Sequence, residues 1–139
     1  MIRALTAGDE ATLQELCRLF KERIPTDDEA TRLLAADDVH VWVAEDDGRL
    51  AGFAYAYVLL RIDGDTSVFL YELGVDERFR RRGHGRSLID EARALAERIG
   101  AVKMWVQTEP ENAAAQRTYE AAGGTRSQQP DILFSWSFR

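Results

Sequence analysis

The feature that most constrains the fold of this chain is a strand, a glycine-rich loop, a helix and a second strand, in that order, between residues 67 and 107. Apolar residues are dense at 67–75, recur three or four positions apart from Leu88 to Ile99, and alternate again at 102–106. Gly100 is placed to end the helix as its C′ residue. A strand-helix-strand passage of this length predicts a right-handed crossover between two parallel strands.

The segments before this crossover predict antiparallel strands. Asp46-Asp47-Gly48 and Asp63-Gly64-Asp65 are turn sequences typical of hairpins. They separate three stretches with β-strand character, at residues 39–44, 50–60 and 67–75. A mixed sheet follows, antiparallel in most of its strand pairs.

The N-terminal segment predicts one short strand and two helices. Residues 2–5 favour the strand. Thr6 with Asp9 has the spacing of a capping box for the first helix, and Asp27 and Asp28 are candidates to cap the second.

The C-terminal segment predicts one more helix and a closing strand. Asn112 follows Pro110 and caps a helix that runs to about Ala122, and residues 132–138 favour a last strand. The element order is then βααβββαβαβ, an α/β (α+β) fold with a mixed, mostly antiparallel central sheet flanked by about four helices. With 139 residues and 45% hydrophobic content, we expect one domain over residues 1–139.

Composition excludes several classes of protein. A single cysteine, Cys17, excludes an internal disulfide framework, and with only two histidines it leaves little material for a zinc site. The longest apolar run, residues 50–60, falls short of the roughly 20 residues needed to span a bilayer. Residues 1–5 lead into a polar turn without the apolar core of a secretory signal, so a cytoplasmic location is expected.

Charge is distributed unevenly along the chain. The net charge is −6, but residues 78–86 hold five arginines and no acidic residue, which leaves −11 for the rest. Such asymmetry favours an anionic partner at the arginines and a cationic one elsewhere. A nucleic-acid partner is not expected, because it needs a broad basic face and the pI is about 5.0.

The arginines lie in a loop suited to binding an anion. Gly83 and Gly85 allow close approach to the backbone, and the unpaired N–H groups at the start of the following helix attract negative charge. Arginines beside them add charge-assisted hydrogen bonds. On these residues alone, a tight turn with a solvated basic edge explains the loop equally well.

Three segments together resemble the Gcn5-related N-acetyltransferase (GNAT) superfamily. Arg80, Gly83 and Gly85 match its coenzyme A signature, Leu73-Gly74-Val75 precedes the loop as expected, and residues 111–123 resemble the later cofactor segment. The resemblance implies a homodimer and acetyl-CoA held between the strand ending at Val75 and the one near residue 102. It implies these cofactor-binding residues: Leu73, Gly74, Val75, Arg80, Arg81, Arg82, Gly83, His84, Gly85, Arg86, Asn112 and Ala115.

Direct transfer to an amine requires proton acceptors and donors. An alkylammonium with a pKa near 10.4 is neutral only about one time in 10³ at pH 7. Glu72 at the end of the cofactor strand is the candidate base, although it could be an ordinary exposed carboxylate. The resemblance implies Tyr119 as proton donor to the departing thiolate, with a packed helix tyrosine as the alternative. Asn112 fits either a pantetheine contact or a helix cap.

The remaining reactive side chains have simpler explanations. Cys17 falls on the apolar face of the first helix, which favours a core position over an acyl carrier. His40 and His84 have no catalytic partner in the sequence, so only the backbone of His84 is expected to matter for cofactor binding.

Within the superfamily, the chain most resembles the short aminoglycoside 3-N-acetyltransferases. That group has an acidic residue where Glu72 stands, and carboxylates at Asp63, Asp65 and Glu109 would suit an acceptor with several ammonium groups. The same carboxylates suit a polyamine, a lysine side chain or a protein N-terminus. A non-catalytic acyl-CoA-binding regulator would need the loop but neither Glu72 nor Tyr119.

Overall fold

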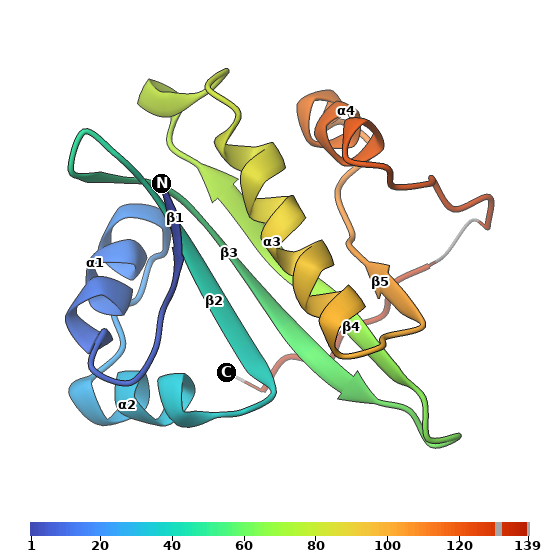
Figure 1. The fold of residues 1–139 in the computed structure, drawn as a ribbon, viewed down its shortest axis with the longest axis horizontal. Helices are drawn as coiled ribbons and strands as arrows, with labels where there is room; N and C mark the ends of the chain where they lie inside the picture. The colour runs from blue at the N-terminus through green and yellow to red at the C-terminus, as the bar shows by residue number, and fades with distance from the viewer. Residues whose placement is uncertain (130–131, 139) are drawn as a thin grey trace.

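The computed structural model describes residues 1–129 and 132–138, and it forms one mixed sheet with helices packed on both faces (Figure 1). The α/β fold class predicted from the sequence is confirmed. The strands, in spatial order, are β1 (Ile2–Ala4), β2 (Val39–Asp46), β3 (Arg49–Leu60), β4 (Thr66–Val75) and β5 (Lys103–Trp105). The helices are α1 (Glu10–Phe20), α2 (Asp27–Ala35), the short 3₁₀ helix η1 (Glu77–Phe79), α3 (His84–Arg98) and α4 (Ala113–Ala121).

The predicted change from antiparallel to parallel pairing is confirmed. Strands β1 to β4 pair antiparallel, and β4 pairs parallel with β5 after the α3 connection. The parallel pairing covers only three rungs, from Ser67 opposite Lys103 to Phe69 opposite Trp105. Beyond Phe69 the two strands are no longer paired, so the last residues of β4 keep one edge for other contacts.

A β-bulge interrupts β4 just before this unpaired stretch. Tyr55 pairs with Glu72, but the next residue of β3, Ala56, pairs with Leu70, which leaves Tyr71 as the extra residue. The bulge breaks the two-residue alternation of side chains. As a result, Tyr71 and Glu72 both contact Tyr55 on one face of the sheet.

The core has two parts, one on each face of the sheet. On one face α3 packs through the apolar stripe predicted from its spacing, with Leu88 and Leu95 against Val68 and Leu70 of β4. On the other face α1 and α2 cover β2 and β3, where Leu13, Leu16, Ala30, Val43 and Phe53 are buried. Cys17 lies at the edge of this second cluster, half-buried, which agrees with the core position expected for it.

Both N-terminal helices begin at residues other than those predicted. The side chain of Asp9 does accept a hydrogen bond from the Thr6 N–H at 2.8 Å, but Asp9 is itself the N-cap and α1 begins at Glu10. The cap of α2 is Thr26, in a complete capping box with Glu29, so Asp27 and Asp28 lie inside the first turn. Thr26 takes this role because Glu29 stands three residues after it and returns the hydrogen bond.

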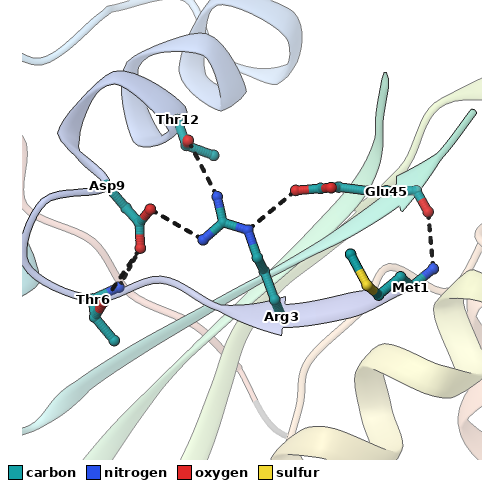
Figure 2. A network of polar contacts seen from close by, with 6 residues as sticks. All are labelled: Met1, Arg3, Thr6, Asp9, Thr12 and Glu45. Carbon is teal, nitrogen blue, oxygen red and sulfur yellow. Dashed lines mark hydrogen bonds and ion pairs between the residues drawn. The ribbon is translucent and has the colours of Figure 1, made fainter. Parts of the chain in front are cut away.

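Arg3 connects three elements at the N-terminal end of the sheet (Figure 2). Its guanidinium donates to Asp9 Oδ1 at 3.0 Å, to Glu45 Oε1 at 3.2 Å and to Thr12 Oγ1 at 3.4 Å. These contacts fix the start of α1 against β1 and β2. The pKa of Asp9 is held below its usual value, mainly by the hydrogen bond from the Thr6 N–H and to a lesser extent by the one from Arg3.

The predicted closing strand at residues 132–138 is wrong. This segment has no strand pairing, and its large apolar side chains are exposed, from 74% at Phe134 to 94% at Phe138. A strand is stable only with a partner, and β5, the edge strand that precedes this segment in the sequence, has only three residues. Within residues 1–129 and 132–138, no helix has the length and apolarity to cross a membrane.

Candidate active site

The separation of β4 from β5 opens a cleft of about 1010 Å³ between β4 and α4. Its walls are the end of β4 from Tyr71 to Val75, the arginine-glycine loop, residues 106–108 after β5, and the inner side of α4. Phe20 at the end of α1 closes one side. This volume lies at the upper end of the range of roughly 300–1,000 Å³ typical of small-molecule and cofactor sites.

The loop between β4 and α3 has the backbone conformation of an anion cradle. Gly83 is the N-cap of α3 and has a left-handed φ of 83°, as does Arg81 at 64°. Gly83 and Gly85 both line the cleft, so the N-terminus of this 15-residue helix borders it. Free N–H groups and the positive end of the helix dipole therefore act on any anion bound there.

The basic side chains of the loop divide into two groups. Arg80, Arg81 and Arg86 line the cleft. Arg82 and His84 do not; both contact Asp46 at the end of β2, at 3.0 Å and 2.8 Å. These two hydrogen bonds, with that of His84 the larger cause, lower the pKa of Asp46. The side chains of Arg82 and His84 thus anchor the loop, while those of Arg80, Arg81 and Arg86 border the cleft.

Glu72 lines the cleft from β4, three residues before the strand ends at Val75, and about 31% of its side chain is exposed. Its Oε1 accepts a hydrogen bond from the Lys21 ammonium at 2.6 Å and another from the Tyr55 hydroxyl at 3.2 Å. Burial, followed by the charge of Glu72, raises the pKa of Tyr55, so the phenol stays protonated and keeps donating. The carboxylate is therefore held in place and already binds an alkylammonium ion.

Tyr119 lines the same cleft from α4 and also packs against the α3-side core. Burial raises the pKa of its phenol, which keeps the proton on oxygen at neutral pH. Glu72 and Tyr119, the two residues predicted to handle protons, thus border one cavity.

Asn112 caps α4, one of the two roles predicted for it, and it also lines the cleft. Its side-chain oxygen accepts a hydrogen bond from the Ala115 N–H at 3.1 Å, which caps α4, and both residues line the cleft. Capping fixes the orientation of the helix that forms this wall.

Three predicted acceptor-binding carboxylates are not brought to the cleft. Asp63 and Asp65 lie in the β3–β4 turn, where Asp63 pairs with Arg61 at 3.2 Å. The turn ends at Asp65, seven residues before Glu72, which at roughly 3.3 Å per residue is about 23 Å away. Glu109 does not line the cleft either. The acidic residues of the sequence suggested a cation site, but the β3–β4 hairpin carries Asp63 and Asp65 to the end of the sheet away from Glu72.

Three residues in or next to the cleft were not predicted from the sequence: Phe20 lines it, and Lys21 and Tyr55 contact Glu72. Lys21, Tyr55 and Phe20 come from segments far from the cofactor motifs, and only the run of aromatic residues at alternate positions of β3 gave a signal. That run continues across the sheet: Tyr55 lies 5.1 Å from Tyr71 between ring centroids, and Phe20 lies 5.0 Å from Phe53. Aromatic rings thus form the surface next to Glu72.

The family model named Acetyltransferase (GNAT) family matches residues 10–124, which include the whole cleft. This chain belongs to the GNAT family. The family assignment made from the Arg80, Gly83 and Gly85 pattern is confirmed.

Curated relatives of this GNAT chain cover part of its length. It is 36% identical over 77 residues to [Ribosomal protein bS18]-alanine N-acetyltransferase of Salmonella typhimurium, which is 55% of this chain and 49% of that protein. It is 37% identical over 107 residues to mycothiol acetyltransferase of Kineococcus radiotolerans, covering 75% of this chain and 33% of that protein. The GNAT chain therefore spans about half or less of the length of these relatives.

Solved structures match the GNAT chain over nearly its full length. An aminoglycoside acetyltransferase, meta-AAC0020 from an uncultured soil metagenomic sample, in complex with sisomicin superposes with a TM-score of 0.90 at 23% identity, covering 100% of this chain and 96% of that one. AAC(6')-Iy in complex with CoA superposes with a TM-score of 0.78 at 25% identity, covering 97% and 93%. The fold is shared with both.

The GNAT family uses acetyl-CoA, and the residues of this cleft fit that group. A pyrophosphate needs donors and positive charge, which Gly83 and three arginines provide at one end. The pantetheine arm needs an extended backbone with free hydrogen-bonding groups, which β4 offers beyond Phe69, where β5 no longer pairs with it.

Proposed function

We propose that this chain is an N-acetyltransferase that transfers the acetyl group of acetyl-CoA directly to a primary amine. One observation carries the proposal: a single cleft is lined both by an anion-binding loop and by an ammonium-binding carboxylate, Glu72. The first group suits a diphosphate and the second suits an amine, so the reactants would meet along β4.

Acetyl-CoA would supply an acetyl group activated as a thioester. Arg80, Arg81 and Arg86, with the N–H groups from Gly83 to Gly85, would hold its pyrophosphate. The backbone of residues 73–75 would hydrogen-bond the pantetheine arm, and Asn112 with Ala115 would border it from α4.

Glu72 would attract the acceptor as an ammonium ion and accept its proton, leaving a neutral nitrogen able to attack. The Tyr55 hydroxyl, 3.2 Å from Glu72 Oε1, keeps the carboxylate oriented during this transfer. General-base assistance of this kind contributes about 10²- to 10⁴-fold in rate.

Tyr119 would donate its phenolic proton to the departing sulfur. The direction of its pKa shift supports this role, because a raised pKa keeps the donor protonated. A neutral thiol is a better leaving group than a thiolate in a cleft that excludes part of the solvent.

An aminoglycoside is the acceptor class that we propose first. The named substrate class of the structures with the same fold and the acidic balance of the chain both support a polycationic acceptor. The motif around Glu72 favours acetylation at the 3-amino group, whereas AAC(6')-Iy bears the 6′ position in its name. If this acceptor is right, the protein confers resistance to the antibiotic that it acetylates.

A protein N-terminus is the second candidate acceptor. The relative that supports it acetylates an alanine of ribosomal protein bS18 and is 36% identical over 77 residues. An α-amino group has a pKa near 8 and needs less help from a base than an alkylamine does. The dependence of rate on Glu72 therefore distinguishes these acceptors.

We also propose that the chain acts as a homodimer in the cytoplasm, where acetyl-CoA is available to it. The exposed apolar side chains of residues 132–138 support self-association, since a surface of this kind marks an interface. Sedimentation equilibrium should give twice the monomer mass; a single monomer at micromolar concentration would contradict the dimer.

The proposed activity is tested by calorimetry with acetyl-CoA, followed by thiol release with aminoglycosides, polyamines and an alanine-terminated peptide. We expect binding together with release for one class of amine, and NMR of the product identifies the acetylated nitrogen. Binding without release would favour an acyl-CoA-binding regulator. Absence of binding would overturn the cofactor assignment.

A further inference from the structure

A second depression lies beside the cleft, between α1 and α2. It has a volume of about 610 Å³ and an apolar floor that includes Leu13, Cys17 and Leu33. Phe20 borders both this depression and the cofactor cleft. Lys21 lines the depression, Glu72 lines the cleft, and their ion pair of 2.6 Å connects the two.

We propose that Lys21 is a specificity-determining residue whose ammonium occupies the position that the acceptor ammonium takes on Glu72. The acceptor enters through the α1–α2 depression and displaces Lys21 before it is acetylated. This inference rests on the proposed function, because it assumes that Glu72 binds the reacting amine.

The surroundings of Lys21 keep the free-energy cost of displacing its side chain from Glu72 low. Its backbone is fixed as the C-cap of α1, where its N–H donates to Cys17 O at 2.8 Å, but its side chain is 40% exposed and leaves an ion pair that water partly screens. Tyr55 continues to donate to Glu72 when Lys21 moves away. The carboxylate therefore keeps its orientation while it exchanges one ammonium ion for another.

Displacement also sets a preference among acceptors. The released Lys21 ammonium stays at the rim of the depression, which Glu22, Arg23 and Glu29 also line. Glu29 already pairs with Arg23 at 2.9 Å. A second ammonium close to the reacting amine meets this positive charge, whereas a hydroxyl or a carboxylate does not. Lys21 thus raises the KM of acceptors that carry a second ammonium beside the reacting amine, relative to acceptors that carry a hydroxyl there and have any other ammonium groups farther away.

The kinetic test compares Lys21→Met, which removes the charge and keeps the stem, with Lys21→Arg, which keeps the charge. Lys103→Met is the matched control, since Lys103 is the other lysine of the chain and lies outside both cavities. We expect Lys21→Met to lower the KM of a diamine about two- to fivefold, to change the KM of a monoamine less, and to leave the KM of acetyl-CoA unchanged. Lys21→Arg should resemble the wild type.

A binding readout separates this inference from the proposed function. With two lysines, a ¹³C-lysine-labelled protein gives two side-chain NMR signals, which Lys103→Met assigns. Saturation with the accepted amine should move the Lys21 signal to the position of a free lysine and leave Lys103 unchanged. An unmoved Lys21 signal during continued thiol release would overturn the inference and leave the proposed function intact. Displacement of Lys21 without thiol release from any amine would count against the proposed function.

Discussion

The Nε2 atom of His84 lies 2.8 Å from Oδ2 of Asp46, which ties the first residue of α3 to the last residue of β2. Arg82 reaches the same oxygen at 3.0 Å, and its guanidinium also lies 5.4 Å from the centre of the Phe79 ring. The turn between β2 and β3 therefore holds the anion-binding loop from outside the cleft. The side chains of Arg82 and His84, two residues that the family resemblance places at the cofactor, thus hold the loop through Asp46.

Asp46→Asn should weaken acetyl-CoA binding without touching the cofactor. It removes the negative charge that orients Arg82 and His84, so the loop loses its fixed conformation and the Kd measured by calorimetry should rise several-fold. Asp47→Asn, one residue along the same turn, is the control and should leave the Kd unchanged. Equal Kd values for both variants and the wild type would contradict the anchoring role.

The stability difference between Asp46→Asn and the wild type should depend on pH. Since the pKa of Asp46 is lowered in the folded state, its carboxylate stabilises the protein above the unfolded-state pKa of about 3.8, and this contribution is lost as the pH falls through the lower folded value. Thermal unfolding should show a lower Tm for the variant at pH 6 and converging values toward pH 3. A Tm difference that stayed constant from pH 6 to pH 3 would contradict a stabilising role for the Asp46 carboxylate.

Glu72→Gln should reduce kcat for an alkylamine acceptor by about 10²- to 10⁴-fold while the Kd for acetyl-CoA stays within twofold of wild type. The amide keeps the size and hydrogen bonds of the side chain but cannot accept the proton. Asp63→Asn is the matched control, because Asp63 lies in the β3–β4 turn away from the cleft, and its kcat should be unchanged. A fully active Glu72→Gln enzyme would exclude Glu72 as base.

Tyr119→Phe should lower kcat by about 10²-fold and leave folding intact. Phenylalanine keeps the packing of the ring against the α3-side core and removes only the proton donor. Circular dichroism and the Kd for acetyl-CoA serve as controls, and both should match the wild type. An unchanged kcat would mean that Tyr119 is a packing residue alone.

Gly83→Ala should destabilise the protein by about 1–2 kcal/mol, because φ at this position is 83° and an L side chain is strained there. It should also raise the Kd for acetyl-CoA. Gly64→Ala provides the comparison, since Gly64 has a φ of 90° in the β3–β4 turn, far from the cleft. In urea unfolding, Gly64→Ala should lose about as much stability as Gly83→Ala, but its Kd for acetyl-CoA should match the wild type. If both variants lost affinity equally, the loss would come from general destabilisation and not from the loop.

Much of the fold follows from local sequence signals. The Asp46-Asp47-Gly48 turn, the apolar stripe of α3 and the Gly100 stop each depend on neighbours within a few residues, and all three are present in the structure. The wrong prediction of a strand at residues 132–138 depended instead on a partner distant in sequence. An alternating apolar pattern shows that a strand is possible, but a strand also needs an available partner edge, which the sequence does not reveal.

The candidate site was predictable where it follows a contiguous motif and not where it depends on distant contacts. The loop from Arg80 to Gly85 and the cap at Asn112 are local features. The contact between Lys21 and Glu72 joins residues 51 positions apart, and the bulge at Tyr71 that turns Glu72 toward Tyr55 arises from strand pairing. Neither leaves a pattern within one segment of sequence.

The central claim, that this cleft transfers an acetyl group to an amine with Glu72 as base, is tested most directly by mass spectrometry of the acceptor after incubation with acetyl-CoA. We expect the wild type to add one acetyl group to an amine of the panel, and Glu72→Gln, at equal occupancy with acetyl-CoA, to add almost none. An acceptor left unmodified by the wild type, or acetylated equally by both proteins, would contradict it.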